Sequence, residues 1–198
     1  MRKLILLLPV LILIAYGCKK EKNVNVDSLS NYPLATGDVW TYQIDDSINH
    51  TTQMATFKIT GSTVFGGVVS YSTQTTINGT IVDSGQIINS GDSVIYQPNG
   101  QSLFSNLTLL FPLAQNNNWH TQYFGDSVFV LAANINFSVL GTNFDSVYNV
   151  GRIQSVPDLY IHQNLYIAPH VGIIQETLDI APWIPVHKTI KLVSYNLH

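Results

Sequence analysis

Six histidines are the residues of this 198-residue chain whose type could bind a metal ion. No two of them lie closer than eight positions in the sequence, whereas zinc sites usually draw two ligands from one local element. A dispersed site on neighbouring strands stays open, for example one built from His162, His170 and His187. Isolated histidines on strands and turns are the favoured interpretation, so we predict no metal and no cofactor. The full set is His50, His120, His162, His170, His187 and His198.

Acid–base catalysis would depend on Glu176, the one glutamate beyond Glu21. A glycosidase could pair it with Asp179 or Asp158, because two carboxyl groups about 5 to 9 Å apart suffice for that chemistry. Sequence position alone gives no support for either pair. The chain also lacks a Gly-x-Ser-x-Gly motif, which marks one large class of serine hydrolases. We therefore expect a protein that is not an enzyme.

The tripeptide Asp-Ser-Val occurs three times, at Asp92, Asp126 and Asp145. A calcium site would need a denser pattern such as Asp-x-Asp-x-Asp within one loop. An aspartate just before a strand commonly caps the preceding turn through hydrogen bonds to its own backbone. We predict that turn-capping role for all three residues.

The most informative segment is the N-terminus. Met1-Arg2-Lys3 is basic, and the run from Leu4 to Tyr16 is apolar throughout. Thirteen residues make a helix of about 20 Å, whereas a bilayer core is about 30 Å thick. A short apolar run after a basic start is typical of a secretory signal peptide.

The apolar run ends in Ala15-Tyr16-Gly17-Cys18, and Cys18 is the only cysteine of the chain. This segment resembles the lipobox of bacterial lipoproteins, with Ala15 and Tyr16 departing from the common form. The resemblance implies cleavage between Gly17 and Cys18, followed by acylation of Cys18. One acyl chain binds a membrane marginally and two or more bind it stably. The implied partner is therefore a membrane, which the N-terminal acyl chains would hold.

Three segments follow from this interpretation: a signal peptide at 1–17, a lipidated flexible tether at 18–30 and a single domain at 31–198. The tether begins with Lys19-Lys20-Glu21-Lys22-Asn23, which is too polar to fold alone. Lys19 stands where an aspartate would resemble an inner-membrane retention signal. We therefore expect an outer-membrane lipoprotein, and which side of that membrane it faces stays open.

Removing the signal peptide takes away Arg2 and Lys3, so seven basic residues remain against twelve acidic ones, a net charge of 7 − 12 = −5. Beyond the tether the basic residues are Lys58, Arg152, Lys188 and Lys191. A nucleic-acid binder needs clustered Lys and Arg to displace counterions from phosphates. The composition therefore excludes that class of partner.

The elements that must position these residues are strands. Alternation of apolar and polar residues, rich in Val, Ile, Thr and aromatic side chains, recurs from Val39 to Tyr195 and is separated by turn residues. Asn78-Gly79 predicts a tight hairpin, because both turn residues must accept a positive φ. The expected strands are 39–44, 54–60, 68–77, 80–82, 86–89, 93–97, 127–140 (bent or broken), 146–154, 159–167, 172–178 and 186–195.

Such spacing without crossover helices predicts an all-β antiparallel meander. The sheet must protect its edges, so we expect a barrel or strongly curved half-barrel, with a β-sandwich as the alternative.

Two stretches echo one another: Tyr32-Pro-Leu-Ala-Thr-Gly-Asp-Val-Trp40 and Phe111-Pro-Leu-Ala-Gln-Asn-Asn-Asn-Trp119. Gly37 and Asn116 occupy the same position, and both residue types enter the left-handed region at low cost. We interpret each stretch as a chain entry, a tight turn and a Trp that begins a strand. Trp40 and Trp119 are expected to fill the core, with a ligand platform as the alternative.

The chain resembles a group of uncharacterised lipoproteins, many from Bacteroidota. Their aromatic-Pro-Leu-x-x-Gly-x-x-Trp-x-Tyr element corresponds to 32–42, and a Tyr-x-Ala-Pro-x-Val-Gly element corresponds to 166–172. The resemblance implies a secreted β protein and implies no activity.

Two functions remain open from the sequence. The first, which we favour at this stage, is a binding or carrier module for a hydrophobic ligand, whose curved sheet would enclose an apolar cavity. The alternative is a structural subunit of the cell envelope, or one that binds a protein or glycan, which would have a filled core and an exposed aromatic patch.

Overall fold

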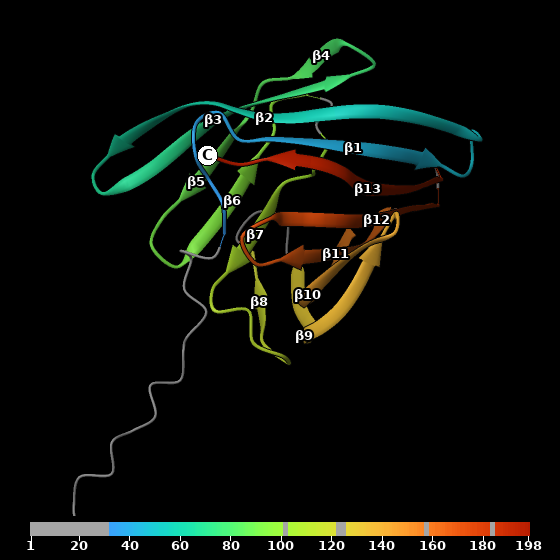
Figure 1. Ribbon diagram of the computed structural model, residues 1–198. Helices are drawn as coiled ribbons and strands as arrows, with labels where there is room; N and C mark the ends of the chain where they lie inside the picture. Colours follow the sequence, from blue (N-terminus) through green and yellow to red (C-terminus); the bar gives the residue numbers. More distant parts are fainter. Residues whose placement is uncertain (1–31, 101–102, 122–125, 157–158, 183–184) are drawn as a thin grey trace, which may run out of the picture.

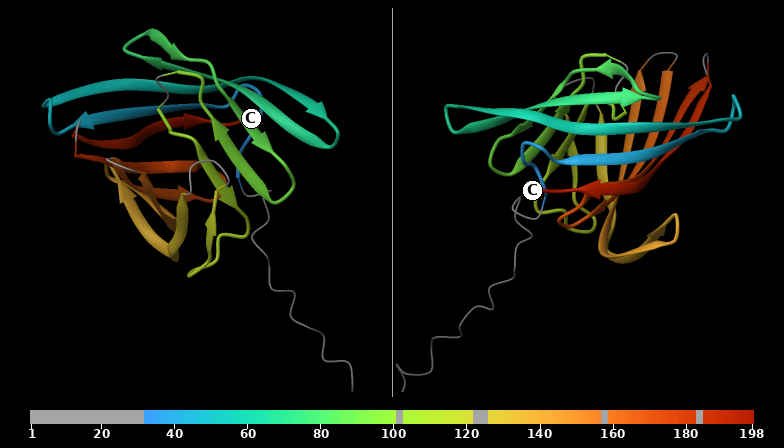
Figure 2. Two further views of the ribbon diagram at one scale, coloured as in Figure 1. Left: turned by 180° about the vertical axis from the view of Figure 1, so that it is seen from behind. Right: turned by 45° about the horizontal axis from the view of Figure 1, so that its top comes forward.

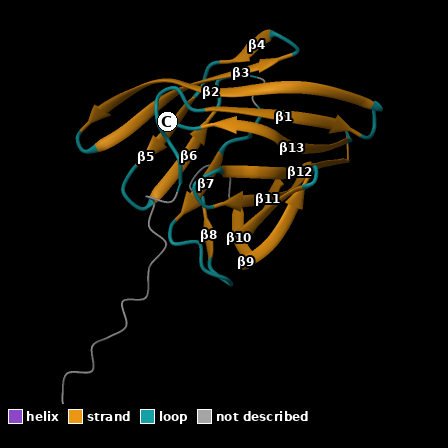
Figure 3. Ribbon diagram, in the orientation of Figure 1, coloured by secondary structure: helices purple, strands orange, loops and turns teal. Residues whose placement is uncertain are grey.

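The computed structural model describes residues 32–100, 103–121, 126–156, 159–182 and 185–198. This part of the chain is built from strands and contains no helix (Figure 3), so none of it could cross a membrane as a helix. The strands are β1 (Val39–Asp46), β2 (Thr51–Phe65), β3 (Val68–Ile77), β4 (Thr80–Asp83), β5 (Gln86–Asn89), β6 (Ser93–Gln97), β7 (Leu107–Leu110), β8 (Asn118–His120), β9 (Ser127–Val139), β10 (Thr142–Val156), β11 (Leu159–Ala168), β12 (Gly172–Pro182) and β13 (Val186–Asn196).

All strand pairs are antiparallel and form one sheet in the order β7-β6-β5-β3-β2-β1-β13-β12-β11-β10-β9-β8, with β4 paired to β3. The pairing of β1 with β13 joins the first and last strands of the chain. The sheet curls until it is nearly closed into a barrel (Figures 1 and 2), which confirms the predicted all-β antiparallel meander and its strong curvature.

Local sequence explains the individual strands. In β1 the side chains of Trp40, Tyr42 and Ile44 are buried and those between them are less so, as expected for a strand with one face on the core. Asn78 and Gly79 have φ values of 48° and 84°, which confirms the predicted tight hairpin between β3 and β4.

The structure departs from the prediction in length and in two strands that are absent from the expected ranges, β7 and the three-residue β8, which was anticipated only as the strand that Trp119 begins. β2 and β10 each span 15 residues and extend beyond the predicted ranges. β7 was missed altogether, because four residues with the sequence Leu-Thr-Leu-Leu alternate too briefly to be recognised. β9 is one bent strand, as expected, and its pairing with β10 shifts register three times between Phe144 and Val150.

The two echoing stretches have the same backbone hydrogen bonds. The amide of Asp38 donates to the carbonyl of Ala35 (3.1 Å), and the amide of Asn117 donates to the carbonyl of Ala114 (3.0 Å). Gly37 and Asn116, with φ values of 103° and 70°, donate to the carbonyls of Ile59 on β2 and Val130 on β9, in each case the partner of the strand that the turn begins. The repeat is therefore structural, and the predicted turn is confirmed in both copies.

Both tryptophans of the repeat serve packing. Trp40 is 4% exposed and its indole N–H donates to the carbonyl of Val171 (2.7 Å). Trp119 is partly buried against the core, and its indole N–H donates to the carbonyl of Thr108 on β7 (3.0 Å). Because β7 and β8 stand at the two ends of the strand order, this side-chain bond bridges the seam where the barrel closes.

The interior is filled by aromatic side chains around Phe104, which lies on the segment between β6 and β7. Its ring makes edge-on contacts with Tyr42, Phe57 and Tyr96, at centroid distances of 5.5 to 5.8 Å. The free volume left beside these rings is about 10 Å³, which is at the lower limit for holding one water molecule. This part of the barrel is therefore a packed core.

Alanine substitutions at two glycines would measure how tightly the chain packs outside that core. A Cβ at Gly85 would lie 2.6 Å from the carbonyl oxygen of Gln97 and 2.8 Å from the Cα of Pro98. We expect Gly85→Ala to lower the free energy of unfolding by about 1–3 kcal/mol, because backbone atoms must move to accept the methyl group. Urea titration followed by tryptophan fluorescence measures the change.

Gly61→Ala is the matched control, since a Cβ there has no neighbour within 4 Å and its φ is not in the left-handed region. This variant should unfold within about 1 kcal/mol of the wild type. Equal stability of the two variants would show that the turn at Gly85 is not tightly packed.

Candidate functional site

The residues predicted at the lipid attachment site, Gly17 and Cys18, lie outside the described residues, as do the signal peptide and the tether. The predicted domain, 31–198, is described from Tyr32 onward. Its candidate site residues can therefore be placed in the barrel, with the exception of Asp158, which also lies outside the described residues.

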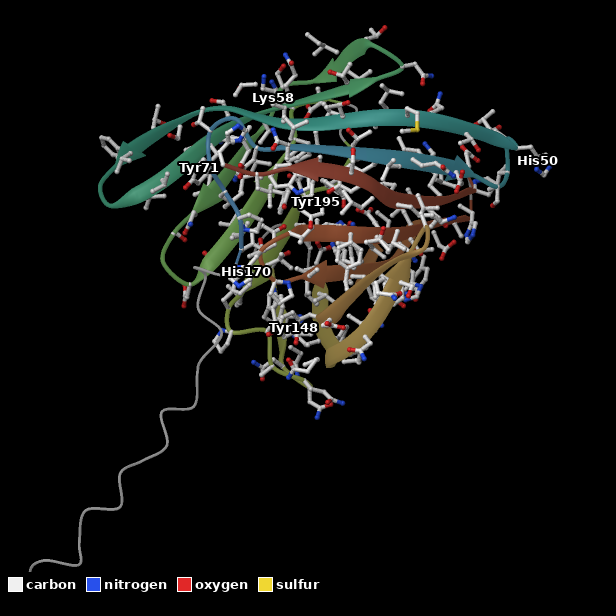
Figure 4. All side chains as sticks on the ribbon, in the orientation of Figure 1. His50, Lys58, Tyr71, Tyr148, His170 and Tyr195 are labelled. Carbon is white, nitrogen blue, oxygen red and sulfur yellow. The ribbon has the colours of Figure 1, made fainter. Side chains whose placement is uncertain are left out.

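The histidines do not converge. His162 lies near the start of β11, about 20 Å of strand before its end at Ala168, and His170 lies in the turn after it. Figure 4 shows His50 and His170 well apart from one another. Among the described residues no group of three His, Cys, Asp or Glu side chains could hold a metal ion. The site considered for His162, His170 and His187 is therefore not formed.

Asp179 of β12 lies between two of these histidines instead. It is in register with His162 of β11 on one side and with His187 of β13 on the other. Its carboxylate is hydrogen-bonded to Nδ1 of His187, and both side chains are about half exposed. An exposed pair of this kind is worth little in water, so we assign it no function.

Of the two carboxylate pairs considered for a glycosidase, Glu176 with Asp179 is not formed, and Asp158 of the other pair lies outside the described residues. Glu176 and Asp179 are three residues apart on β12, so their side chains point to opposite faces of the sheet. Glu176 is fully buried in the barrel and Asp179 is exposed outside it. The structure brings Glu176 instead to a set of polar residues that the sequence did not single out as a site.

The turn-capping role predicted for the Asp-Ser-Val aspartates is not found at any of the three positions. Asp92 lies in the turn between β5 and β6, where its backbone amide donates to Ser90, although no side-chain cap is formed. Asp145 lies inside β10, where the register with β9 shifts, and not before a strand. Asp126 does precede β9, but its carboxylate is buried and paired with Arg152.

Arg152 of β10 organises the buried polar residues, which we call the interior network. Its Nε donates to Oδ2 of Asp126 (2.9 Å), and Nη2 donates to the same oxygen. Nη1 donates to Ser105 (2.9 Å) and to Oε1 of Gln163 (3.2 Å). The amide of Gln163 then donates to Oε1 of Glu176 (2.9 Å). Three strands (β10, β11 and β12), the residue before β9 and the β6–β7 segment thus meet through hydrogen bonds inside the barrel.

The charges of this network are compensated at one end and not at the other. Arg152 and Asp126 are 3% and 2% exposed and neutralise one another, as buried charges must. Glu176 has no charged partner in direct contact. Burial raises the pKa of its carboxyl to about 8, and the hydrogen bond from Gln163 and the charge of Arg152 oppose that rise only in part. Glu176 is therefore largely neutral at pH 7.

Two oxygens of the network have no hydrogen-bond partner among the described residues: Oδ1 of Asp126 and Oε2 of Glu176. An unpaired buried acceptor is costly and rare in folded proteins. A neutral carboxyl group reduces this cost at Glu176. The unpaired oxygen of Asp126 belongs to a carboxylate that is charged through its pair with Arg152, so protonation does not reduce its cost. Asp126 is also one of the residues that line a cleft.

This cleft, which we call the seam cleft, has a volume of about 170 Å³. It lies between β6 and β7 on one side and the chain around Thr121 and Asp126 on the other, next to the seam of the barrel. Its lining combines amide and hydroxyl groups with the side of Tyr96. The lining residues are Ile95, Tyr96, Gln97, Asn106, Leu107, Thr108, Thr121 and Asp126.

Sequence reasoning missed both the network and the cleft. Arg152 appeared only as one of few basic residues, although an isolated Arg at the same strand phase as Val150 and Gln154 is a signal for a buried ion pair. The cleft had no local signal, because its residues come from three separate segments.

No protein-family model matches this chain, and no curated protein matches it as a relative. Solved structures match it in fold. One is a protein from Parabacteroides distasonis described provisionally as a lipoprotein, with a TM-score of 0.51 and 10% identity over 83% of this chain and 97% of that one. Another is a protein from Bacteroides fragilis described provisionally as exported, with a YmcC-like fold, a TM-score of 0.53 and 10% identity over 83% and 98%. At this identity the likeness shows a shared fold.

Glu176 makes the stability of the barrel depend on pH. Its pKa is about 8 in the folded protein, above the ordinary value of 4.5, so the unfolded chain loses this proton first as the pH rises. Stability should therefore be full below about pH 4.5 and decrease up to about pH 8. We expect Glu176→Gln to flatten this dependence and to raise the free energy of unfolding at pH 7.5 by about 2–4 kcal/mol.

Urea titrations of both proteins at pH 5, 6, 7 and 8 measure the effect. Asp45→Asn is the control, because hydrogen bonds from Lys191, Gln43 and Thr52 lower the pKa of that surface carboxyl. Parallel curves for the wild type and Glu176→Gln would contradict a neutral buried carboxyl group.

Proposed function

We propose that the protein is an envelope lipoprotein, acylated on Cys18 and held in the outer membrane, whose barrel is a non-enzymatic module that binds a glycan in the seam cleft. The lipobox-like segment ending at Cys18 supports the anchor. The two structures of the same fold, one described as a lipoprotein and the other as exported, support a location in the cell envelope.

The observation that carries the binding role is the seam cleft, whose lining includes Asp126, a residue that keeps one buried oxygen without a partner among the described residues. A volume of about 170 Å³ equals the share of about five or six waters in the liquid, at about 30 Å³ each. That space suits one small ring better than a long acyl chain. Amide and hydroxyl groups from Gln97, Asn106 and Thr108 complement a ligand rich in hydroxyl groups.

The carrier role for a hydrophobic ligand has less support. A carrier needs an apolar cavity, and the space beside Phe104, Tyr42 and Phe57 is about 10 Å³. The filled core therefore favours the alternative drawn from the sequence, an interaction module, over a lipid carrier.

The anchor is tested by Cys18→Ala. Wild-type cells fed an alkyne-bearing palmitate should incorporate the label into this protein, and the variant should incorporate none, because Cys18 is the acylated residue. Intact mass should also show that the variant keeps its signal peptide. Lys19→Ala is the control and should be labelled as the wild type is. Labelling of the Cys18→Ala variant would contradict the anchor.

The cleft is tested by Asn106→Trp in the full-length acylated protein. Asn106 is exposed and lines the cleft, so an indole there should fill the space without disturbing the fold. On an array of bacterial oligosaccharides, the variant should lose at least about tenfold in affinity, which corresponds to about 1.4 kcal/mol.

Asn136→Trp is the matched control, because Asn136 is exposed on β9 and does not line the cleft. It should bind as the wild type does. Unchanged binding by Asn106→Trp would contradict the site. Recovery of a stoichiometric apolar molecule from an organic extract, in addition to the acyl anchor, would instead support the carrier.

A further inference from the structure

The tip of the β2–β3 hairpin, residues 64–69, is an uncovered apolar surface. Val64 is 70% exposed and Phe65 is 90% exposed. The turn is made by Gly66 and Gly67, with φ values of 59° and 82°, and a Cβ at either position would have no neighbour within 4 Å. Isolated apolar residues on a surface are ordinary, but a phenylalanine exposed to this extent at the end of a projecting hairpin has no packing role in the barrel.

The tip is also free of charge. From Ile59 to Ser72 the sequence has no Asp, Glu, Lys, Arg or His, and its polar residues are Ser, Thr and Tyr. Moving such a segment out of water does not require a charged side chain to be desolvated. The tip is therefore suited to an apolar environment beside an interface, where hydroxyl groups can remain hydrated.

The sheet register places the tip at one end of the barrel. Val39, the first residue of β1, pairs with Lys58, so the seven residues from Ile59 to Phe65 project past the start of β1. At about 3.3 Å per residue this projection past β1 is about 23 Å. On the other side of the hairpin β5 pairs with β3 as far as Val69, so residues 65–68 at the turn are the part that extends beyond both neighbouring strands. The described chain enters at the same end: in both Figures 1 and 2 the blue segment that leads into β1 lies on the side of the molecule from which the hairpin tip projects.

The length of chain before the barrel matches this geometry. From Cys18 to Tyr32 there are 32 − 18 = 14 residues. If this segment is the flexible tether that its sequence predicts, it has a root-mean-square span of about 20 Å and a maximum of about 50 Å. A bilayer that holds the acyl chains of Cys18 therefore lies at about the distance that the hairpin projects.

We propose that the β2–β3 tip inserts into the surface of the bilayer that holds Cys18 and so orients the barrel on it. This inference rests on the proposed lipid anchor. The anchor keeps one bilayer within reach of the tip at high effective concentration, which favours lipid over any protein partner that must diffuse to it. Two attachment points, the acyl chains and Phe65, would hold one end of the barrel toward the membrane and direct the opposite end away from it.

The test uses the full-length acylated protein in vesicles of phosphatidylethanolamine and phosphatidylglycerol. Phe65→Cys is labelled with an environment-sensitive fluorophore. An acylated Cys18 carries a thioether and does not react, so the label occupies one position. Ile48→Cys is the matched control: it lies in the turn at the other end of β2, about 46 Å along that strand, and is 43% exposed.

The label at position 65 should shift to shorter emission wavelength on reconstitution, and nitroxide-bearing lipids should quench it several-fold more than the label at position 48. Equal, solvent-like emission and equal quenching at both positions would overturn the proposal. A blue shift that appears without vesicles and grows with protein concentration would also overturn it, because a second copy would then cover the tip. The intact mass of the same sample records the acyl chains, so a failure of the anchor is distinguished from a failure of the tip.

Discussion

The packing of Phe104 inside the barrel is the contact on which the rest of the structure depends. The β6–β7 segment carries this ring into the interior, where it meets Tyr42, Phe57 and Tyr96 edge-on. Each such aromatic pair contributes about 0.5–1.5 kcal/mol beyond the area that it buries. Because strands from the first half of the sheet surround this ring, the sheet curves around it, and the space that a lipid carrier would need is occupied.

The interior of the barrel becomes polar toward the second half of the sheet. There Arg152, Gln163 and Glu176 replace apolar side chains, and hydrogen bonds connect them to Asp126 next to the seam. A buried polar network fixes which strands lie opposite one another more specifically than apolar contacts do. Its Asp126 also lines the seam cleft, so one arrangement of residues both supports the closure of the barrel and contributes to a candidate binding site.

Much of the fold could be predicted because its signals are local. The hairpin at Asn78-Gly79 and the turns at Gly37 and Asn116 each depend on residues that tolerate a positive φ, and all were found at the expected positions. The candidate site could not be predicted in the same way. Asp126 was expected to cap a turn because its neighbours resemble those of Asp92, and only its distant contact with Arg152 gives it a different role.

By itself the sequence determined the class of fold, the order of most strands and the chemistry available at the N-terminus, since these follow from alternation, turn residues and one cysteine. The tertiary structure alone decided which face of each strand is internal. The alternation of a strand defines two faces but does not say which of them points into the barrel. Closure of the sheet turns one face inward. That choice buries Glu176, exposes Asp179 three residues away, and brings Asp126, Tyr96 and Asn106 to one cleft.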